Sequence, residues 1–264
     1  MRLLSVARDL HRRRGRERSG LFLAEGIRTV EELLASGLPL RGALVSPSLS
    51  ETERGSELAR RLAASGPEGR YGAGYEVAEV SDRELALAAA TDSPQGVLAL
   101  AAQPERSFDE LPQSVPLLIV VLDGVQDPGN VGTILRTAEA FGASATVALA
   151  GTADLWNPKV VRSAMGALFT QYAFASSADA LLDFCRANAV ELWATDAGGE
   201  PLQPGLAPPS GAPDRLAIVV GNEGNGVSGA VTRAADRTIA IPIRGVESLN
   251  VAVAAGILLY TLTA

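Results

Sequence analysis

The sequence predicts an α/β protein with a mostly parallel sheet in its C-terminal half and a smaller α/β domain before it. Short apolar runs alternate with amphipathic segments, a pattern typical of a parallel sheet covered by helices on both faces. The length of 264 residues and the hydrophobic content of 47% are enough for two cores. Residues 101–116 contain three prolines without clear periodicity, so we expect this linker to join domains at residues 1–100 and 117–264.

Composition limits the classes of function. The net charge of −7 excludes a protein that is basic all over, so any nucleic acid must meet a local positive patch. Cys185 is the only cysteine, which excludes an internal disulfide and a cysteine-based zinc site and fits a reducing cytoplasm. Because its neighbours form an apolar helix, we expect Cys185 to be a buried side chain and not a nucleophile.

Membrane and metal partners are not expected. The N-terminal residues lack the unbroken apolar stretch of a signal peptide, and the C-terminal apolar segment is too short for a membrane span. His, Cys and carboxylate residues do not cluster at the spacing of metal ligands. We therefore expect a cytoplasmic protein without a metal.

The N-terminal residues 1–20 combine an apolar stripe with a run of arginines. Leu3, Val6, Ala7 and Leu10 fall at helical spacing. The arginines around this stripe are the densest cluster of positive charge in the chain and could bind RNA phosphates. The alternative interpretation is a solvated charged face without a partner. The candidate RNA-contacting residues are Arg12, Arg13, Arg14, Arg16 and Arg18.

The rest of the N-terminal half alternates strand and helix patterns. A strand at 21–23 precedes a helix at 27–34, and a second strand follows at 42–45. Ser81 and Glu84 have the spacing of a capping box, which predicts a helix from there through Ala90. Another strand is expected at 95–100.

The C-terminal half opens with an apolar strand at 117–122 and a turn-rich loop. Asn130 is a natural N-cap for the helix that follows, which buries a stripe ending at Phe141 and leaves Arg136 outside it. Gly, Pro and Ala dominate a long loop at 196–214, and such loops are commonly functional. Further strands are expected at 145–149, 171–174 and 190–194, and further helices at 159–169 and 178–189.

A glycine-rich loop follows the apolar strand at 216–220. The strand stops at Gly221, and the carboxyl end of a parallel strand is where open α/β sheets place ligands. The loop 221–226 does not have the G-x-G-x-x-G spacing, which argues against an alternative function as a nicotinamide-dependent oxidoreductase. An ordinary strand-to-helix turn is the other interpretation.

The chain ends with a strand at 239–243, a polar loop and an apolar helix at 251–259. Ser248 or Asn250 can N-cap this helix. Small side chains at Ala252, Ala255 and Gly256 allow another backbone to approach closely, so we expect the helix to pack inside the fold.

Three of these stretches resemble the motifs of the SpoU family of RNA ribose methyltransferases, in the SPOUT superfamily. They are LDGVQDPGNVGTILRTAEAFG at 122–142, GNEGNGVS at 221–228 and IPIRGVESLNVAVAAGI at 241–257, in the family's order. The stretch 18–28 also resembles the start of the substrate-binding domain found before many SpoU catalytic domains. The absence of a histidine base from all three motifs leaves Arg136 and the amide, hydroxyl and carboxylate side chains as the polar candidates.

The resemblance implies an S-adenosylmethionine-dependent RNA 2′-O-ribose methyltransferase that acts as a homodimer. It also implies a C-terminal trefoil knot and an N-terminal RNA-binding domain similar to certain ribosomal proteins. Ribosomal RNA is favoured as the substrate. A transfer RNA methyltransferase and a catalytically silent RNA-binding homologue are the alternatives.

The resemblance also assigns candidate site residues. Arg136 would orient the ribose hydroxyl and stabilise the developing alkoxide, because a guanidinium is a poor base. The remaining catalytic candidates are Asn130, Glu223, Ser248 and Asn250, and the candidates for holding the cofactor are Gly221, Asn222, Glu223, Gly226, Ile241, Leu249, Asn250, Ala194 and Thr195.

Overall fold

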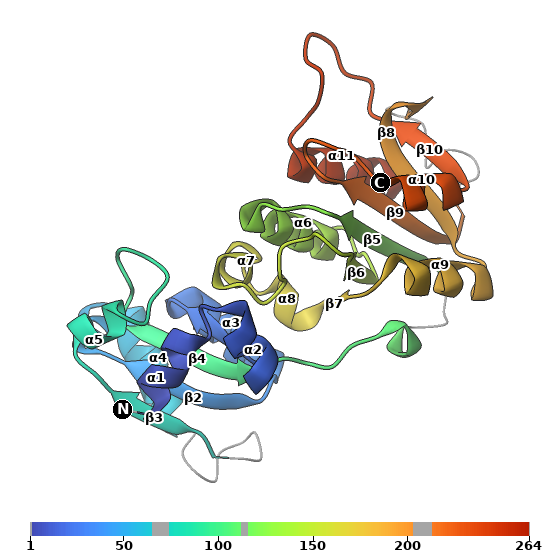
Figure 1. Cartoon of the computed structure of the whole chain (residues 1–264). Helices are drawn as coiled ribbons and strands as arrows, with labels where there is room; N and C mark the ends of the chain where they lie inside the picture. The colour runs from blue at the N-terminus through green and yellow to red at the C-terminus, as the bar shows by residue number, and fades with distance from the viewer. Residues whose placement is uncertain (1, 65–73, 112–115, 203–212, 264) are drawn as a thin grey trace. The chain divides into compact units, whose positions relative to one another are not determined.

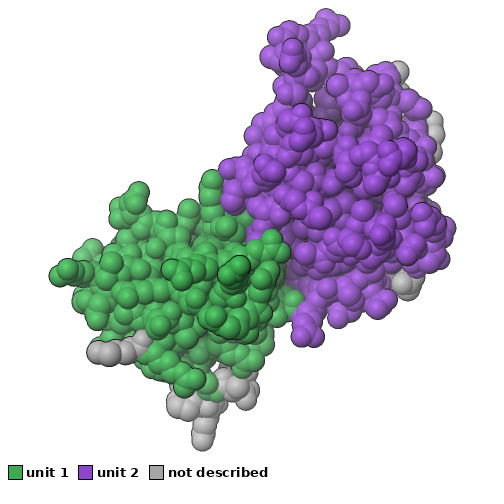
Figure 2. Space-filling view, viewed as in Figure 1, with its two compact units in different colours: residues 1–104, 156–170 green, residues 105–155, 171–264 purple. Residues whose placement is uncertain are grey.

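The structure is a computed structural model that describes residues 2–64, 74–111, 116–202 and 213–263. Its contacts divide the chain into two compact units (Figure 2). Unit 1 comprises Met1–Pro104 together with Trp156–Thr170, and unit 2 comprises Glu105–Leu155 together with Gln171–Ala264. Among the described residues, no helix is long and apolar enough to cross a membrane, and no His, Cys, Asp and Glu side chains group as a metal site.

Unit 1 is built on a four-stranded mixed sheet in the order β1-β4-β2-β3 (Figure 1). The central strand β4 (Val97–Ala102) is antiparallel to both β1 (Leu21–Glu25) and β2 (Leu40–Val45). At the edge, β3 (Glu76–Glu79) pairs with β2 in parallel, and this half-exposed strand was not among the predicted elements.

Helices cover both faces of this sheet. Leu23, Leu44 and Leu98 point to the face that packs against Leu10 and Leu85, and the alternate side chains, such as Phe22, point to the other. The helices of unit 1 before β4 are α1 (Arg2–Asp9), α2 (Arg13–Ser19), α3 (Ile27–Ser36), α4 (Glu53–Ala64) and α5 (Asp82–Ala86), with a 3-10 turn η1 (Pro47–Glu51).

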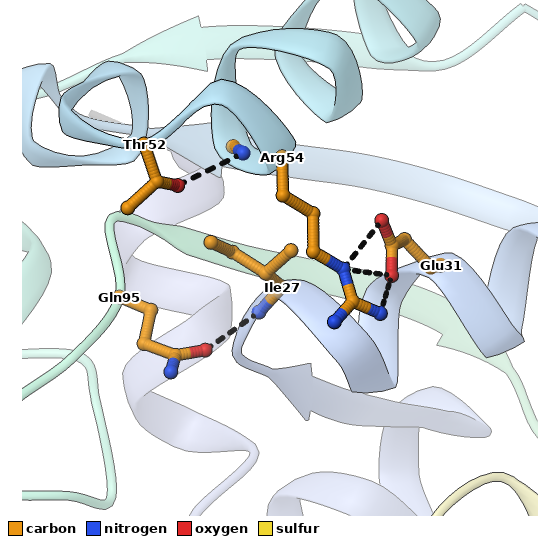
Figure 3. Close-up of polar contacts among 6 residues, drawn as sticks. Ile27, Glu31, Thr52, Arg54 and Gln95 are labelled. Atoms are coloured by element: carbon orange, nitrogen blue, oxygen red, sulfur yellow. Dashed lines mark hydrogen bonds and ion pairs between the residues drawn. The ribbon is translucent and has the colours of Figure 1, made fainter.

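Polar contacts tie these helices to one another at the surface of unit 1. The Gln95 side chain accepts a hydrogen bond of 3.0 Å from the Ile27 backbone N–H at the start of α3, and Arg54 on α4 forms a forked ion pair with Glu31 on α3 (Figure 3). The capping box at Ser81 is confirmed, but α5 ends at Ala86. It stops short of the predicted Ala90 because the buried carboxylate of Glu25 accepts the backbone N–H of Ala90 at 2.7 Å.

Residues 156–170 belong to unit 1 although they lie between two strands of unit 2 in sequence. The Trp156 and Phe169 rings pack on Phe22 of β1, with centroids 4.5 Å and 5.5 Å away. The helix predicted at 159–169 is interrupted, because the left-handed backbone at Met165 and Gly166 divides it into α7 (Pro158–Ser163) and α8 (Ala167–Thr170).

Part of the predicted linker at 101–116 packs with unit 2. Residues from Glu105 onward are part of unit 2. Phe108 in the short turn η2 (Phe108–Glu110) stacks on Phe184 at 4.6 Å between centroids, and Leu111 is buried in the core of unit 2.

Unit 2 contains a six-stranded sheet in the order β10-β8-β9-β5-β6-β7. Each neighbouring pair of described strands is parallel, which confirms the predicted sheet. The long loop predicted at 196–214 is shorter, because β8 continues to Pro201, and residues 203–212 lie outside the described residues. The strands are β5 (Leu117–Asp123), β6 (Ala145–Ala148), β7 (Tyr172–Ala175), β8 (Glu191–Pro201), β9 (Arg215–Gly221) and β10 (Arg237–Ala240).

The helices of unit 2 lie on both faces of its sheet (Figure 1). One face packs its apolar side chains against α9 (Ala178–Ala187) and α10 (Gly229–Ala234). On the other face α11 (Val251–Thr263) packs against α6 (Pro128–Ala140). Burial raises the pKa of the Cys185 thiol on α9 to about 11, so this side chain stays protonated at neutral pH.

One predicted cap and one burial prediction need correction, and a second predicted cap is confirmed. The cap of α6 is Asp127 and not Asn130, since the Asp127 carboxylate accepts the Asn130 backbone N–H at 2.9 Å. Asn250, one of two predicted candidates, caps α11 by accepting from the backbone N–H of Ala252 at 2.9 Å. The prediction that α11 is packed inside the fold is wrong for one face, where Val253, Ile257 and Tyr260 are 53%, 39% and 62% exposed.

Candidate active site

The candidate site begins where β5 and β9 end side by side. Asp123 and Gly221 are register partners at the carboxyl ends of these parallel strands, so the loops that follow them start together. Asp123 is 7% exposed, and its carboxylate accepts the backbone N–H of Ser228 at 2.7 Å. This bond ties the end of β5 to the far end of the glycine-rich loop.

The glycine-rich loop is a closed, internally bonded turn. The backbone groups of Asn222 and Gly226 exchange two hydrogen bonds of 2.9 Å, and the Asn222 side-chain oxygen accepts the backbone N–H groups of Gly224 and Asn225. A Cβ at Gly221 would lie 2.1 Å from the Gly226 carbonyl carbon, so a larger residue would force the turn open.

A chain of side-chain hydrogen bonds joins the three motif regions. Asn130 on α6 donates to Glu223 in the glycine-rich turn at 3.0 Å, and Asn250 donates to the Asn130 side-chain oxygen at 3.0 Å. Because Asn250 also caps α11, the relative positions of α6, the turn and α11 are fixed by one amide pair and one carboxylate.

The carboxylate of Glu223 is ionised at neutral pH. Partial burial acts to raise its pKa, but hydrogen bonds from the Asn130 side chain and from backbone N–H groups, including that of Gln126, bring the pKa below its ordinary value. Glu223 is therefore a fixed negative charge at the site and a poor acceptor for a proton.

Arg136 projects from α6 without a polar partner. It is exposed, and its guanidinium makes no hydrogen bond or ion pair with another residue in the described part of the chain. Asn130 lies six positions earlier on the same helix. The structure therefore links Arg136 to the Glu223–Asn130–Asn250 chain through α6 alone, and leaves its five N–H donors available to a ligand.

The loop 241–249 contrasts with the glycine-rich turn. None of its residues makes a hydrogen bond to another described residue, and the predicted strand at 239–243 ends at Ala240. Ile241 and Leu249 are half-buried, whereas Ser248 is exposed and makes no polar contact with the described residues. This segment therefore presents backbone donors and acceptors that a ligand could occupy.

Two cofactor candidates on β8 have structural contacts. Ala194 is buried in the sheet, where it pairs with Val219 of β9. The hydroxyl of Thr195 donates to the Val219 carbonyl at 2.9 Å. Their backbone lies beside β9, but the described contacts do not bring their side chains to the Glu223–Asn130–Asn250 chain.

The predicted RNA-contacting arginines fall into three groups. Arg16 is 2% exposed and donates to the Leu10 and His11 carbonyl oxygens at 2.7 Å and 3.0 Å, so it is a structural residue and its prediction as an RNA contact is corrected. Arg13 forms an ion pair with Glu17, and Arg18 forms one with Asp9. Arg12 and Arg14 are exposed.

Comparison with known proteins gives the family. The model of the SpoU rRNA Methylase family matches residues 117–260, and that of the MRM3-like substrate binding domain matches residues 6–99. The chain belongs to the SpoU rRNA methylase family. This confirms the resemblance that the three motifs suggested.

The relatives match almost the whole chain. The 23S rRNA (guanosine(2553)-2′-O)-methyltransferase RlmP of Bacillus subtilis is 34% identical over 97% of this chain and 93% of its own length. The 23S rRNA (uridine(2479)-2′-O)-methyltransferase of Streptomyces viridochromogenes is 29% identical over 95% of this chain and 85% of its own.

Solved SpoU structures share the fold. The SpoU methyltransferase AviRb from Streptomyces viridochromogenes, in complex with AdoMet, has a TM-score of 0.85 at 28% identity and covers 99% of this chain and 96% of its own. A solved RNA 2′-O ribose methyltransferase has a TM-score of 0.79 at 32% identity, covering 98% and 94%. The predicted fold class, an α/β SPOUT domain after a substrate-binding domain, is confirmed, whereas the trefoil knot stays a prediction.

Sequence reasoning missed several residues that build the site. Asp123, Gly124 and Thr152 all hold the loops after β5 and β9 by hydrogen bonds. Asp123 carried a signal, because a carboxylate that ends an apolar strand needs a buried donor. Thr152 carried none, since it lies outside the three motifs.

Proposed function

We propose that this protein transfers a methyl group from S-adenosylmethionine to a ribose 2′-hydroxyl of ribosomal RNA. The observation that carries the proposal is the Glu223–Asn130–Asn250 chain, which joins the three motif regions and includes a residue of α6, the helix that also carries the unpaired Arg136. Membership of the SpoU family supports the reaction class. The printed names of the relatives, which are 23S rRNA 2′-O-methyltransferases, support the choice of RNA.

The residues present fit S-adenosylmethionine. The open backbone groups of 241–249 and the half-buried Ile241 and Leu249 offer hydrogen bonds and apolar contact to a nucleoside. The ionised Glu223 places negative charge near the glycine-rich turn, which favours a cationic ligand. When bound, S-adenosylmethionine supplies a methyl group on a positively charged sulfur.

Arg136 acts on the RNA in this proposal. Its guanidinium orients the ribose hydroxyl and the neighbouring phosphate, and it stabilises the negative charge that develops on the attacking oxygen. The oxygen forms a bond to the methyl carbon as the sulfur recovers its electron pair, and the hydroxyl proton passes to water. Arg136 does not take that proton, because a guanidinium remains protonated at neutral pH.

Unit 1 recruits the RNA. Its residue ranges hold 16 of the 23 Arg and Lys residues and 14 of the 30 Asp and Glu residues, a net charge of +2. Unit 2 holds the remaining 7 and 16, a net charge of −9. A polyanion is therefore favoured only at unit 1, where Arg12 and Arg14 are exposed beside the ion-paired Arg13 and Arg18.

The protein acts as a cytoplasmic homodimer in this proposal. Val253, Ile257 and Tyr260 recur at helical spacing on the exposed face of α11, and the Tyr260 ring lies 6.2 Å from that of Phe141 after α6. A second copy would cover this apolar face. Sedimentation equilibrium at micromolar protein tests the state, and a monomer would contradict it.

Transfer of a labelled methyl group tests the function. Purified protein with S-adenosylmethionine should label 23S rRNA from cells that lack the gene, and it should label rRNA from cells that retain the gene much less. Mapping the 2′-O-methyl position then gives the nucleotide. Labelling of transfer RNA alone would show that transfer RNA, and not ribosomal RNA, is the substrate. RNA binding without methyl transfer would support the catalytically silent alternative.

A further inference from the structure

A hydroxyl outside the three motifs holds the loop at the end of β5. Thr152 follows β6, and its Oγ1 donates to the Leu122 carbonyl at 2.8 Å while it accepts the Gly124 backbone N–H at 3.0 Å. A threonine hydroxyl has one proton and two lone pairs, so it can make both bonds at once. A further bond of 2.9 Å from the Ala153 N–H to the Val125 carbonyl continues this pairing.

The residue that Thr152 holds is conformationally special. Gly124 has φ +77, a left-handed conformation that glycine adopts without strain. A Cβ added to Gly151, the residue before Thr152, would lie 3.5 Å from the Gly124 Cα, so the two loops are in close contact. The carbonyl of Gly124 accepts a hydrogen bond of 2.9 Å from the Asn222 side-chain amide.

Gly124 is thus clamped from two sides. The Thr152 hydroxyl accepts the Gly124 backbone N–H, and the Gly124 carbonyl accepts the Asn222 side-chain amide. The other side-chain atom of Asn222 organises the glycine-rich turn by accepting the N–H groups of Gly224 and Asn225. That turn carries Glu223, which Gln126 and Asn130 approach from the loop after Gly124 and from α6.

We propose that Thr152 is a positioning residue for the cofactor site. Its hydroxyl sets the Gly124 conformation, and through Asn222 it sets the shape of the glycine-rich turn and the position of Glu223. The proposal rests on the proposed function only in assigning this turn to S-adenosylmethionine. Thr152 touches neither the substrate nor the reacting atoms.

Replacement of the hydroxyl tests the role. Thr152→Val keeps the branched shape but leaves the Gly124 N–H and the Leu122 carbonyl without this partner. We expect the dissociation constant and KM for S-adenosylmethionine to rise about tenfold, the effect of losing one or two hydrogen bonds, with kcat changed less than about twofold because Arg136 is untouched. Calorimetry and steady-state kinetics on the full chain measure both.

Matched variants separate positioning from a general loss of stability. Thr152→Ser retains the hydroxyl and should bind S-adenosylmethionine as the wild type does. Thr263→Val removes a hydroxyl that donates only to the Leu259 carbonyl at 2.9 Å in the last turn of α11, and it should leave binding unchanged. A folded Thr152→Ser variant that binds S-adenosylmethionine about tenfold more weakly than the wild type would overturn the proposal, and this test holds even if Thr152→Val fails to fold.

Amide hydrogen exchange separates this proposal from the function proposed for the site. The Gly124 and Gly224 amides should exchange faster in Thr152→Val than in the wild type, and at the wild-type rate in Thr152→Ser. If the wild type did not bind S-adenosylmethionine, the proposed function would be contradicted. Faster amide exchange in Thr152→Val would still show that Thr152 holds Gly124 and the glycine-rich turn in place. The proposed role of Thr152 would be overturned if Thr152→Val left both the exchange of these amides and the affinity for S-adenosylmethionine unchanged.

Discussion

Unit 1 and unit 2 differ in charge and in how they use polar side chains. Unit 1 is slightly basic, and its buried or paired polar groups, such as Glu25, Arg16 and the Arg54–Glu31 pair, hold its own elements together. Unit 2 is strongly acidic, and it gathers Asp123, Asn130 and Glu223 where β5 and β9 end. The difference indicates that recruitment and chemistry are separated, because an acidic unit repels a polyanion unless another part of the chain holds it.

The most severe test of this comparison removes the recruiting part. Deletion of residues 1–100 takes away Phe22 and uncovers Trp156 and Phe169, which are 8% and 2% exposed in the full chain. Because exposing a large apolar side chain costs about 1.5–3 kcal/mol, we expect the fragment to aggregate and to lose rRNA methylation. Soluble yield and thermal unfolding measure this.

A second fragment supplies the control for the deletion. The same truncation with Trp156→Ser and Phe169→Ser should recover soluble protein without recovering RNA affinity. A simple truncation that is soluble and as stable as the full chain would show that residues 156–170 do not depend on residues 1–100 for their packing. Normal RNA binding by that truncation would show that unit 1 does not recruit the RNA.

The next test removes the proposed RNA-activating group from unit 2. Arg136→Ala should lower the methylation rate about 10²–10³-fold, the usual effect of losing a donor to a developing oxyanion, while the affinity for S-adenosylmethionine stays within twofold. Single-turnover methyl transfer and calorimetry give the two values. Arg136→Lys should also fail because an ammonium cannot replace the planar fork, and substantial turnover in either variant would remove the assigned role.

The two units also differ in how far the sequence predicted them. The parallel strands and the motif loops of unit 2 could be predicted because apolar runs and glycine positions are local signals. Asp127, and not Asn130, caps α6, although Pro128 at the first helical position already favoured Asp127. A sequence pattern does not say which of several arginines turns inward, so Arg16 was predicted as an RNA contact although it is buried. It also does not say on which sheet an apolar side chain packs, so the packing of Trp156 in unit 1 could not be predicted.

A milder test probes the positive surface of unit 1. Arg12→Ala combined with Arg14→Ala should weaken RNA binding about threefold to tenfold and reduce its salt dependence, because two phosphate contacts are lost. Cofactor affinity should not change. Arg186→Ala is the control from unit 2, since this exposed arginine pairs with Asp183. If Arg186→Ala weakened RNA binding as much as the double variant, the charge difference between the units would not direct recruitment.

The smallest expected effect concerns the pH dependence of unit 2. Partial burial acts to raise the pKa of Glu223, but the hydrogen bonds from Asn130 and the backbone lower this pKa on balance. The ionised Glu223 therefore contributes stability above the ordinary carboxylate pKa, and this contribution is lost as the pH falls through the lowered value. Urea unfolding from pH 7 to pH 3 should show the wild type losing slightly more stability than Glu223→Gln, since the glutamine does not titrate. Because the side chain is largely solvated, the difference should shrink further in high salt. Parallel curves for the two proteins would mean that the bond from Asn130 does not favour the ionised carboxylate, and the negative charge assigned to the cofactor site would lose its support.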